Sequence, residues 1–177
     1  MKKSFRMAIP LLMLGLCASQ GRAQMSMGRM VEYAVEKKVT VDAPLDKVWD
    51  SLSNLQSLPK YAGGYITAVA REGKTKAYSF TMQDGSVVKG QLDYLEPHSD
   101  NRFCIITLAA PLPDSIQTIE WLLTVKYAPD GKGVVVRWAA VIEGGKDGAK
   151  DRLKLQLGEM FDAYLKGLAG YFPVRQN

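Results

Sequence analysis

The sequence predicts an α+β domain in which an antiparallel sheet packs against one long C-terminal helix. Three observations indicate this fold class. A strand-like run lies near the start, six more strand-like runs follow after a short helical region, and a long amphipathic stretch ends the chain. Strands that succeed one another through short turns pair antiparallel. We therefore expect a seven-stranded sheet and a single domain over residues 33–177.

The first strand is expected over residues 33–42, with Val35, Lys37, Val39 and Val41 on one face and Glu36, Lys38 and Thr40 on the other. Ala43 and Pro44 end this strand. A short helix should follow, capped by Asp46 or a neighbour and running to about Asn54. Residues 55–61 predict a second helical turn, which Gly63 and Gly64 stop.

The six later strands are expected over residues 66–71, 76–82, 86–95, 102–109, 116–127 and 133–143. Sequences typical of hairpin turns separate several of them, as in Gln83-Asp84-Gly85 and Asp130-Gly131. After a break at residues 144–148, a helix is expected over residues 149–171. Its apolar stripe, spaced at three and four residues, comprises Leu153, Leu157, Met160, Phe161, Tyr164, Leu168 and Phe172.

Residues 1–23 are predicted to be a signal peptide. Lys2, Lys3 and Arg6 precede an apolar run of about a dozen residues, which is too short to span a bilayer, and cleavage is expected after Ala23. Two alternatives are an uncleaved N-terminal membrane anchor and lipidation at Cys17, which the preceding Leu16 disfavours. Residues 24–32 are expected to form a flexible tail. The mature protein would then be periplasmic or secreted.

Removal of the predicted signal peptide, residues 1–23, changes the interpretation of the net charge. The chain has 23 Lys and Arg against 18 Asp and Glu, and four of the bases but none of the acids lie in residues 1–23. The remaining 19 bases nearly balance 18 acids. Since no clustered basic face is left, we expect no nucleic-acid partner. Cys104 would be the one cysteine of the mature chain, a buried and inert thiol.

Few residues suggest catalysis or metal binding. His98 is the one histidine and lies in a hydrophilic turn, so a solvated loop histidine is expected rather than part of a triad with Ser99 and Asp100. One cysteine and one histidine do not make a metal site of the usual kind. The glycine-rich segment 144–148 lacks the phosphate-loop pattern and is interpreted as a hinge. We expect no catalytic residues, no metal and no cofactor.

One segment carries a family resemblance. Val39 to Asn54 places a strand, Ala43-Pro44, three residues and then Val48-Trp49 of a helix, and Leu58-Pro59-Lys60-Tyr61 follows. This pattern resembles the opening of the START/Bet v1-like superfamily (SRPBCC), also called the polyketide cyclase/dehydrase and lipid transport family. The resemblance implies a helix-grip fold. Its curved seven-stranded antiparallel sheet surrounds the C-terminal helix, two short helices follow strand 1, and a cavity takes an apolar ligand.

The resemblance also suggests where the ligand lies. Residues expected to line the cavity are Phe80, Trp121, Leu123, Arg137, Trp138, Ala140, Leu157, Phe161 and Tyr164. Because strands alternate, either Trp138 and Ala140 or Arg137 and Ala139 face inward, and the pattern leaves both choices open. An inward Arg137 would anchor an acidic head group. An outward Arg137 would form a cross-strand ion pair with Glu120.

We therefore expect an exported protein that binds a small hydrophobic or amphipathic ligand, such as a lipid, fatty acid, sterol-like or polyketide-like compound. Burial of the ligand away from water would drive binding, and the last helix and the glycine-rich loop would gate it. Membrane contact is expected only transiently, during ligand exchange. One alternative is a cyclase-, dehydrase- or hydrolase-type enzyme on the same fold. Another is an envelope interaction protein with a collapsed pocket.

Overall fold

The structure is a computed structural model, and it describes residues 31–109, 112 and 115–175. The predicted signal peptide and residues 24–30 of the predicted tail lie outside this part of the chain. The elements, in order, are β1 (Val35–Val41), α1 (Leu45–Ser53), η1 (Leu55–Lys60), β2 (Ile66–Arg71), β3 (Ala77–Met82), β4 (Val87–Glu96), β5 (Asn101–Ala109), β6 (Ile116–Tyr127), β7 (Val134–Gly144) and α2 (Asp147–Ala169). Each strand begins and ends within two residues of its predicted range.

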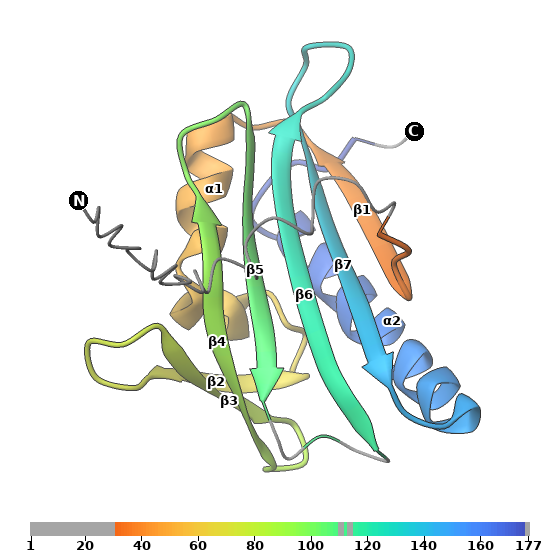
Figure 1. The fold of residues 1–177 in the computed structure, drawn as a ribbon. Coiled ribbons are helices and arrows are strands. Elements are labelled where there is room, and N and C mark those ends of the chain that lie inside the picture. The colour runs from red at the N-terminus through yellow and green to blue at the C-terminus, as the bar shows by residue number, and fades with distance from the viewer. Residues whose placement is uncertain (1–30, 110–111, 113–114, 176–177) are drawn as a thin grey trace, which may run out of the picture. The chain divides into compact units, whose positions relative to one another are not determined.

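The seven strands form one antiparallel sheet in the order β1-β7-β6-β5-β4-β3-β2. The helices lie on one face of it, and β2 and β3 turn across the ends of β4 and β5 (Figure 1). Register shifts between Leu92 and Tyr94, between Ile66 and Ala68, and between Ile116 and Thr118 interrupt the regular pairing. Such bulges bend strands and increase twist, which accounts for the curvature of the sheet. The predicted α+β helix-grip architecture is confirmed.

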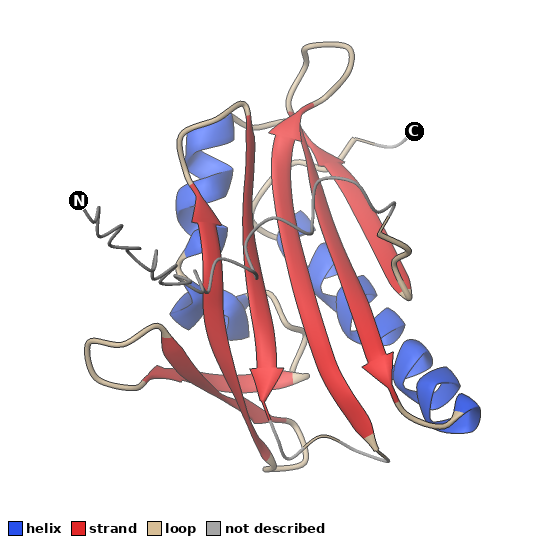
Figure 2. Cartoon of the chain, viewed as in Figure 1, coloured by secondary structure: helices blue, strands red, loops and turns tan. Residues whose placement is uncertain are grey.

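The inner face of the sheet follows the alternation of the sequence. On β7, Trp138 and Ala140 are buried on the inner face together with Val134 and Val136. Their partners on β6 are inner-face residues as well, since Leu123 pairs with Trp138 and Trp121 with Ala140. The stripe predicted for the last helix is buried throughout, from Leu153 to Phe172. Sheet and α2 therefore enclose the apolar core between them, on the side of the sheet where the helices lie (Figure 2).

The first helix differs from prediction at its start. The residue before α1 is Pro44, in an extended conformation, and no side chain caps the helix. Asp46, the predicted cap, lies in the first turn and pairs instead with Arg102 of β5. Because the helix begins at Leu45, Asp46 lies past the capping position. Trp49 of the same helix is 3% exposed and belongs to the core, as its helical spacing indicates.

The two halves of α2 have different surroundings. In the C-terminal half, a side chain at Gly167 would place its Cβ 2.2 Å from the carbonyl oxygen of Tyr61, so the end of η1 lies directly against the helix backbone. Gly63 similarly approaches Ala163. In the same half, Asp162 forms an ion pair of 2.7 Å with Lys37 of β1. These contacts hold the C-terminal half of α2 close to the rest of the fold.

Candidate functional site

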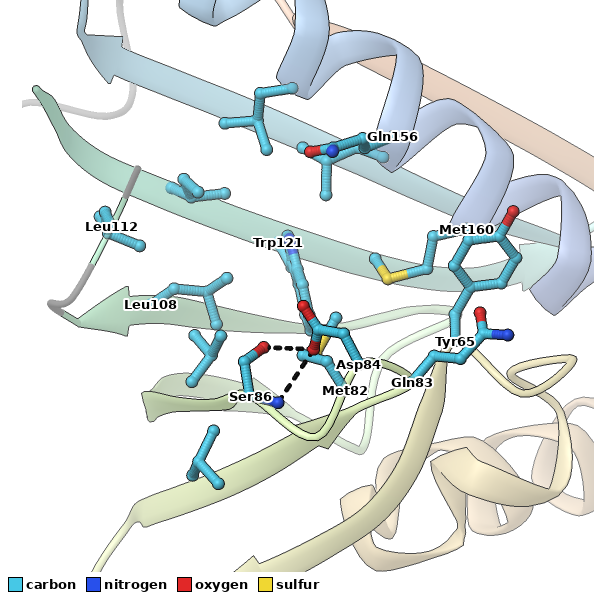
Figure 3. Close-up of a pocket in the computed structure, with 15 residues that line it drawn as sticks. Tyr65, Met82, Gln83, Asp84, Ser86, Leu108, Leu112, Trp121, Gln156 and Met160 are labelled. Atoms are coloured by element: carbon cyan, nitrogen blue, oxygen red, sulfur yellow. Dashed lines mark hydrogen bonds between the residues drawn. The ribbon is translucent and has the colours of Figure 1, made fainter. Parts of the chain in front are cut away.

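A pocket of about 730 Å³ lies beside the N-terminal half of α2. Its walls come from that half of the helix, from the turn between β3 and β4, from the end of β5 and from the start of β6 (Figure 3). The lining residues are Tyr65, Met82, Gln83, Asp84, Ser86, Val87, Val88, Leu108, Leu112, Ile119, Trp121, Leu153, Gln156, Leu157 and Met160. The pocket is thus at the end of the sheet where α2 begins.

The inner wall is apolar because periodic positions of three elements converge there. Leu153, Leu157 and Met160 recur at helical spacing along α2, and all three are buried. Ile119 and Trp121 are alternate residues of β6 and therefore share its inner face. Apolar side chains of β3, β4 and β5 complete this wall. Such a surface suits an apolar ligand.

The polar lining residues lie at the rim. Gln83, Asp84, Ser86 and Gln156 are all exposed. The Asp84 carboxylate accepts hydrogen bonds from the Ser86 hydroxyl at 2.6 Å and from the Ser86 backbone N–H at 2.9 Å. These bonds lower the pKa of the Asp84 carboxyl. The rim therefore carries a negative charge at neutral pH.

Tyr65 connects the two sides of the pocket mouth. Its backbone carbonyl accepts a hydrogen bond from the N–H of Gln83, beside the β3–β4 turn, at 3.0 Å. Its hydroxyl donates to Glu159 of α2 at 3.4 Å. Figure 3 shows its ring next to Met160. Tyr65 thus contacts the turn through its backbone carbonyl and the helix through its side chain.

Of the predicted cavity residues, Trp121 and Leu157 line the pocket. Phe80, Leu123, Trp138, Ala140, Phe161 and Tyr164 lie in the packed core instead. The Trp138 ring lies 5.7 Å from that of Phe161 and 5.1 Å from that of Tyr164, measured between centroids. Phe80 contacts Trp121 edge to face at 5.6 Å. These aromatic residues fill the space that the prediction had assigned to a ligand.

Arg137 lies on the outer face of the sheet, so it cannot anchor a head group in this pocket. It pairs in register with Thr124, bonds the Thr124 hydroxyl at 3.3 Å, and forms an ion pair with Glu36 of β1 at 3.5 Å. Its guanidinium lies 5.1 Å from the centre of the Tyr33 ring. The outward orientation was one of the two alternatives, and it follows from the inward position of Trp138.

The expected partner of Arg137 was Glu120, but the register set by the turn at residues 130–131 places Thr124 opposite Arg137. Glu120 pairs with Val141 on β7 and with Thr107 on β5, four residues along β6 from the partner of Arg137. Burial raises the pKa of Glu120, and the nearby carboxylates of Glu143 and Asp93 raise it further. Glu120 therefore belongs to an acidic part of the outer face.

The sequence did not predict most of the pocket-lining residues, because hydrophobic periodicity does not show where the distance between a helix and a sheet increases. Leu153 and Met160 were in the predicted stripe of the last helix. No feature of the pattern separated these residues from Phe161 and Tyr164, which share the same spacing. Nothing in the sequence marked Tyr65, just before a predicted strand, or Val88, within one, as a pocket residue.

Three buried polar atoms have no hydrogen-bond partner among the described residues: Nε1 of Trp121, Nε1 of Trp138 and the hydroxyl of Tyr164. Only Trp121 lines the pocket. Burial raises the pKa of Tyr164 well above its ordinary value, so its hydroxyl remains protonated. The pocket wall thus contains one hydrogen-bond donor without an acceptor among the described residues, Nε1 of Trp121.

Metal ligands, membrane-spanning helices and the histidine are the remaining features to place. In the described part of the chain, no group of three His, Cys, Asp or Glu is arranged to hold a metal ion. Nor does any helix there have the length and apolar character to cross a bilayer. His98 is exposed in the turn after β4, at the opposite end of that strand from the pocket. Its backbone N–H donates to Glu96 at 2.9 Å.

Comparison with known proteins identifies the family. The model of the family described as polyketide cyclase / dehydrase and lipid transport matches residues 32–172. The chain therefore belongs to this family, as the Ala43-Pro44 and Val48-Trp49 pattern suggested. No match was found among curated proteins.

Solved structures show the same fold at low identity. Protein XoxI from Bacillus cereus is 16% identical, with a TM-score of 0.67 over 78% of this chain and 94% of that one. Major latex-like protein 151 from Panax ginseng is 10% identical, with a TM-score of 0.60 over 77% and 95%. The Zhui aromatase/cyclase from Streptomyces sp. R1128 is 18% identical, with a TM-score of 0.59 over 77% and 91%. Identities this low establish the fold alone.

Proposed function

We propose that this chain is an exported protein that binds a small hydrophobic or amphipathic molecule in the pocket beside the N-terminal half of α2. The observation that carries the proposal is the pocket itself, of about 730 Å³ and with an apolar inner wall. Its volume falls within the range of roughly 300–1,000 Å³ that is usual for small-molecule sites. Membership of a family that includes lipid transport supports this function.

Binding would be driven by removal of apolar surface from water. Leu153, Leu157 and Met160 on one side and Ile119 on the other would contact the ligand. The rim would remain hydrated, since its polar side chains are exposed. The ligand would enter between the β3–β4 turn and α2, where the Tyr65 hydroxyl contacts Glu159 of α2.

The glycine-rich connection would allow such movement at the start of α2. Gly144 and Gly145 both have positive φ, at 73° and 82°. A side chain on Gly145 would place its Cβ 2.3 Å from Cδ1 of Ile116. Glycine is therefore required both by backbone conformation and by the close approach of β6. Because contacts with η1 and β1 hold the C-terminal half of α2, the pocket would open by displacement of the first turns of the helix, next to this connection.

The two alternatives have less support. An enzyme would need polar groups that converge inside the pocket, whereas Gln83, Asp84, Ser86 and Gln156 lie at its rim. The Zhui protein is an aromatase/cyclase, but its likeness to this chain extends to the fold only. An interaction protein with a collapsed pocket would have no space beside Leu157, where the pocket is found.

Filling the pocket tests the proposal. Val88→Phe adds volume at a half-buried lining position of β4. The uncharged dye N-phenyl-1-naphthylamine should fluoresce strongly with the wild-type protein, and the variant should bind it at least about tenfold more weakly at a stability cost of ~1–3 kcal/mol. Val135→Phe makes the same change at a half-buried position on the outer face and should leave dye affinity unchanged. An equal loss of dye affinity in Val88→Phe and Val135→Phe, or no dye binding by the wild type, would contradict the proposal.

A further inference from the structure

The inner wall of the pocket contains a single polar group that lacks a partner. Trp121 is 2% exposed and lines the pocket, and its Nε1 has no acceptor among the described residues. Figure 3 places its indole between the β3–β4 turn and α2, among the lining side chains. A buried N–H without an acceptor has lost its hydration and gained no bond in return, so binding of an acceptor beside it is favourable. An indole nitrogen donates and does not accept.

The pocket lining also carries negative but no positive charge among the described residues. The described lining residues include no Lys, Arg or His, and the one charged residue among them is Asp84. Hydrogen bonds from Ser86 lower the pKa of Asp84, which keeps it ionised. Arg137, the residue that might have paired with an acidic head group, lies on the outer face. An anionic group that entered this pocket would lose its hydration and meet no cation.

From these two observations we infer that the ligand is an uncharged apolar molecule with an oxygen acceptor, such as a ketone, ester, lactone or quinone, and that Nε1 of Trp121 donates to that oxygen. Anionic lipids and free fatty acids are discriminated against. The inference rests on the proposed function, because it concerns the same pocket. It assigns Trp121 as the residue that orients the ligand and determines its chemical class.

Access to the donor requires a small rearrangement. Nε1 is buried in the structure, so the ligand must displace a neighbouring side chain to reach it. Met160 lines the pocket next to Tyr65 in Figure 3 and has an unbranched, flexible side chain. A change of rotamer in Met160 would cost little compared with movement of a branched residue.

Three size-matched dyes test the inference. The first is 6-propionyl-2-(dimethylamino)naphthalene, an uncharged ketone. The second is the propyl analogue, which has CH₂ in place of the carbonyl. The third is 6-(dimethylamino)naphthalene-2-carboxylate, which has a carboxylate in place of the propionyl group. The wild-type protein should bind the ketone more tightly than the carboxylate. In Trp121→Phe, which removes the donor and keeps an aromatic ring, the ratio of ketone Kd to propyl Kd should rise about two- to tenfold. Emission of the bound ketone should also shift to shorter wavelength, since its carbonyl loses a hydrogen bond.

Trp138→Phe is the matched control. Trp138 has the same unpaired Nε1 on the same face of the sheet, but it packs against Phe161 and Tyr164 and does not line the pocket. Its substitution should leave the Kd ratio and the emission unchanged. Equal affinity of the propyl analogue for the wild type and Trp121→Phe would show that the variant pocket is intact.

The outcomes separate this inference from the proposed function. If the propyl dye binds but the ratio is the same in the wild type and Trp121→Phe, the role of Trp121 is wrong while the binding function stands. Tighter binding of the carboxylate than of the ketone would overturn the inferred ligand class. If none of the three dyes binds, both the inference and the proposed function fail.

Discussion

Cys104 shows how the position of a residue on a strand determines its chemistry. It lies on the inner face of β5, opposite Leu123, and is fully buried. Burial raises the pKa of its thiol from the ordinary value of 9.0 to about 12. Since the thiolate is the reactive form, the thiol is inert in the folded protein, as its strand-like context predicted.

This raised pKa predicts a loss of stability at alkaline pH. Between pH 9 and 12 the thiol of the unfolded chain ionises while that of the folded protein stays protonated. Raising the pH therefore favours unfolding, by up to about 1.4 kcal/mol per pH unit, and the effect is absent below pH 9. Urea unfolding at pH 8 to 10 should show this decline.

Cys104→Ala provides the comparison. The variant will be less stable at every pH because it creates a cavity, but it should lack the part of the decline that comes from the thiol. Measurements up to pH 10 limit the contribution of Tyr164, whose pKa is raised above its ordinary value of 10.0. An identical slope in the two proteins would show that Cys104 ionises at the same pH folded and unfolded.

At the scale of elements, α2 combines a tightly held half with a half that lines the pocket. Gly167 allows the carbonyl of Tyr61 to lie against the helix, whereas added Cβ atoms at Gly158 would meet nothing within 4 Å. The contrast places the close packing at the C-terminal half and leaves room near the middle of the helix.

The two glycines give opposite predictions for the same substitution. Gly158→Ala should stabilise the protein by up to about 1 kcal/mol, because alanine favours a helix and the space is free. Gly167→Ala should destabilise it by about 1–3 kcal/mol despite the same gain in propensity, since the new Cβ would lie 2.2 Å from the Tyr61 oxygen. Thermal or urea unfolding of both variants measures this. Stabilisation by both would mean that η1 is not held against α2.

At the scale of the whole molecule, the sheet and the helix enclose both a core and a pocket. The aromatic residues Trp138, Phe161 and Tyr164 fill the space beside the C-terminal half of α2. The same inner face, continued to Trp121 and Ile119, borders the pocket. Neighbouring residues on the inner face of the sheet therefore either pack in the core or line the pocket, depending on how closely α2 approaches them.

Export is a prediction that rests on residues 1–23. Lys2, Lys3 and Arg6, the short apolar run and the small residues at Gly21 and Ala23 predict cleavage after Ala23. N-terminal sequencing of the protein from the periplasm or the medium should begin at Gln24. Recovery of cytosolic protein that retains Met1 would refute export, and an uncleaved membrane-bound form would favour the anchor alternative.

The sequence alone determined the order and limits of the elements, because period-two and period-3.6 patterns and turn residues are local properties. The alternation of β7 restricted the inner face to two choices, and the stripe of α2 identified its buried side. The family could also be inferred, since Ala43-Pro44 and Val48-Trp49 stand at a characteristic spacing.

Tertiary structure decided which of these residues border the pocket. The inward face of β7 depends on its pairing with β1 and β6, so the outward position of Arg137 was not a local property. The separation of Trp121 and Leu157 from Trp138 and Phe161 depends on the distance between helix and sheet. That distance is controlled by contacts far apart in the sequence, such as Tyr61 with Gly167 and Lys37 with Asp162, which no periodic pattern encodes.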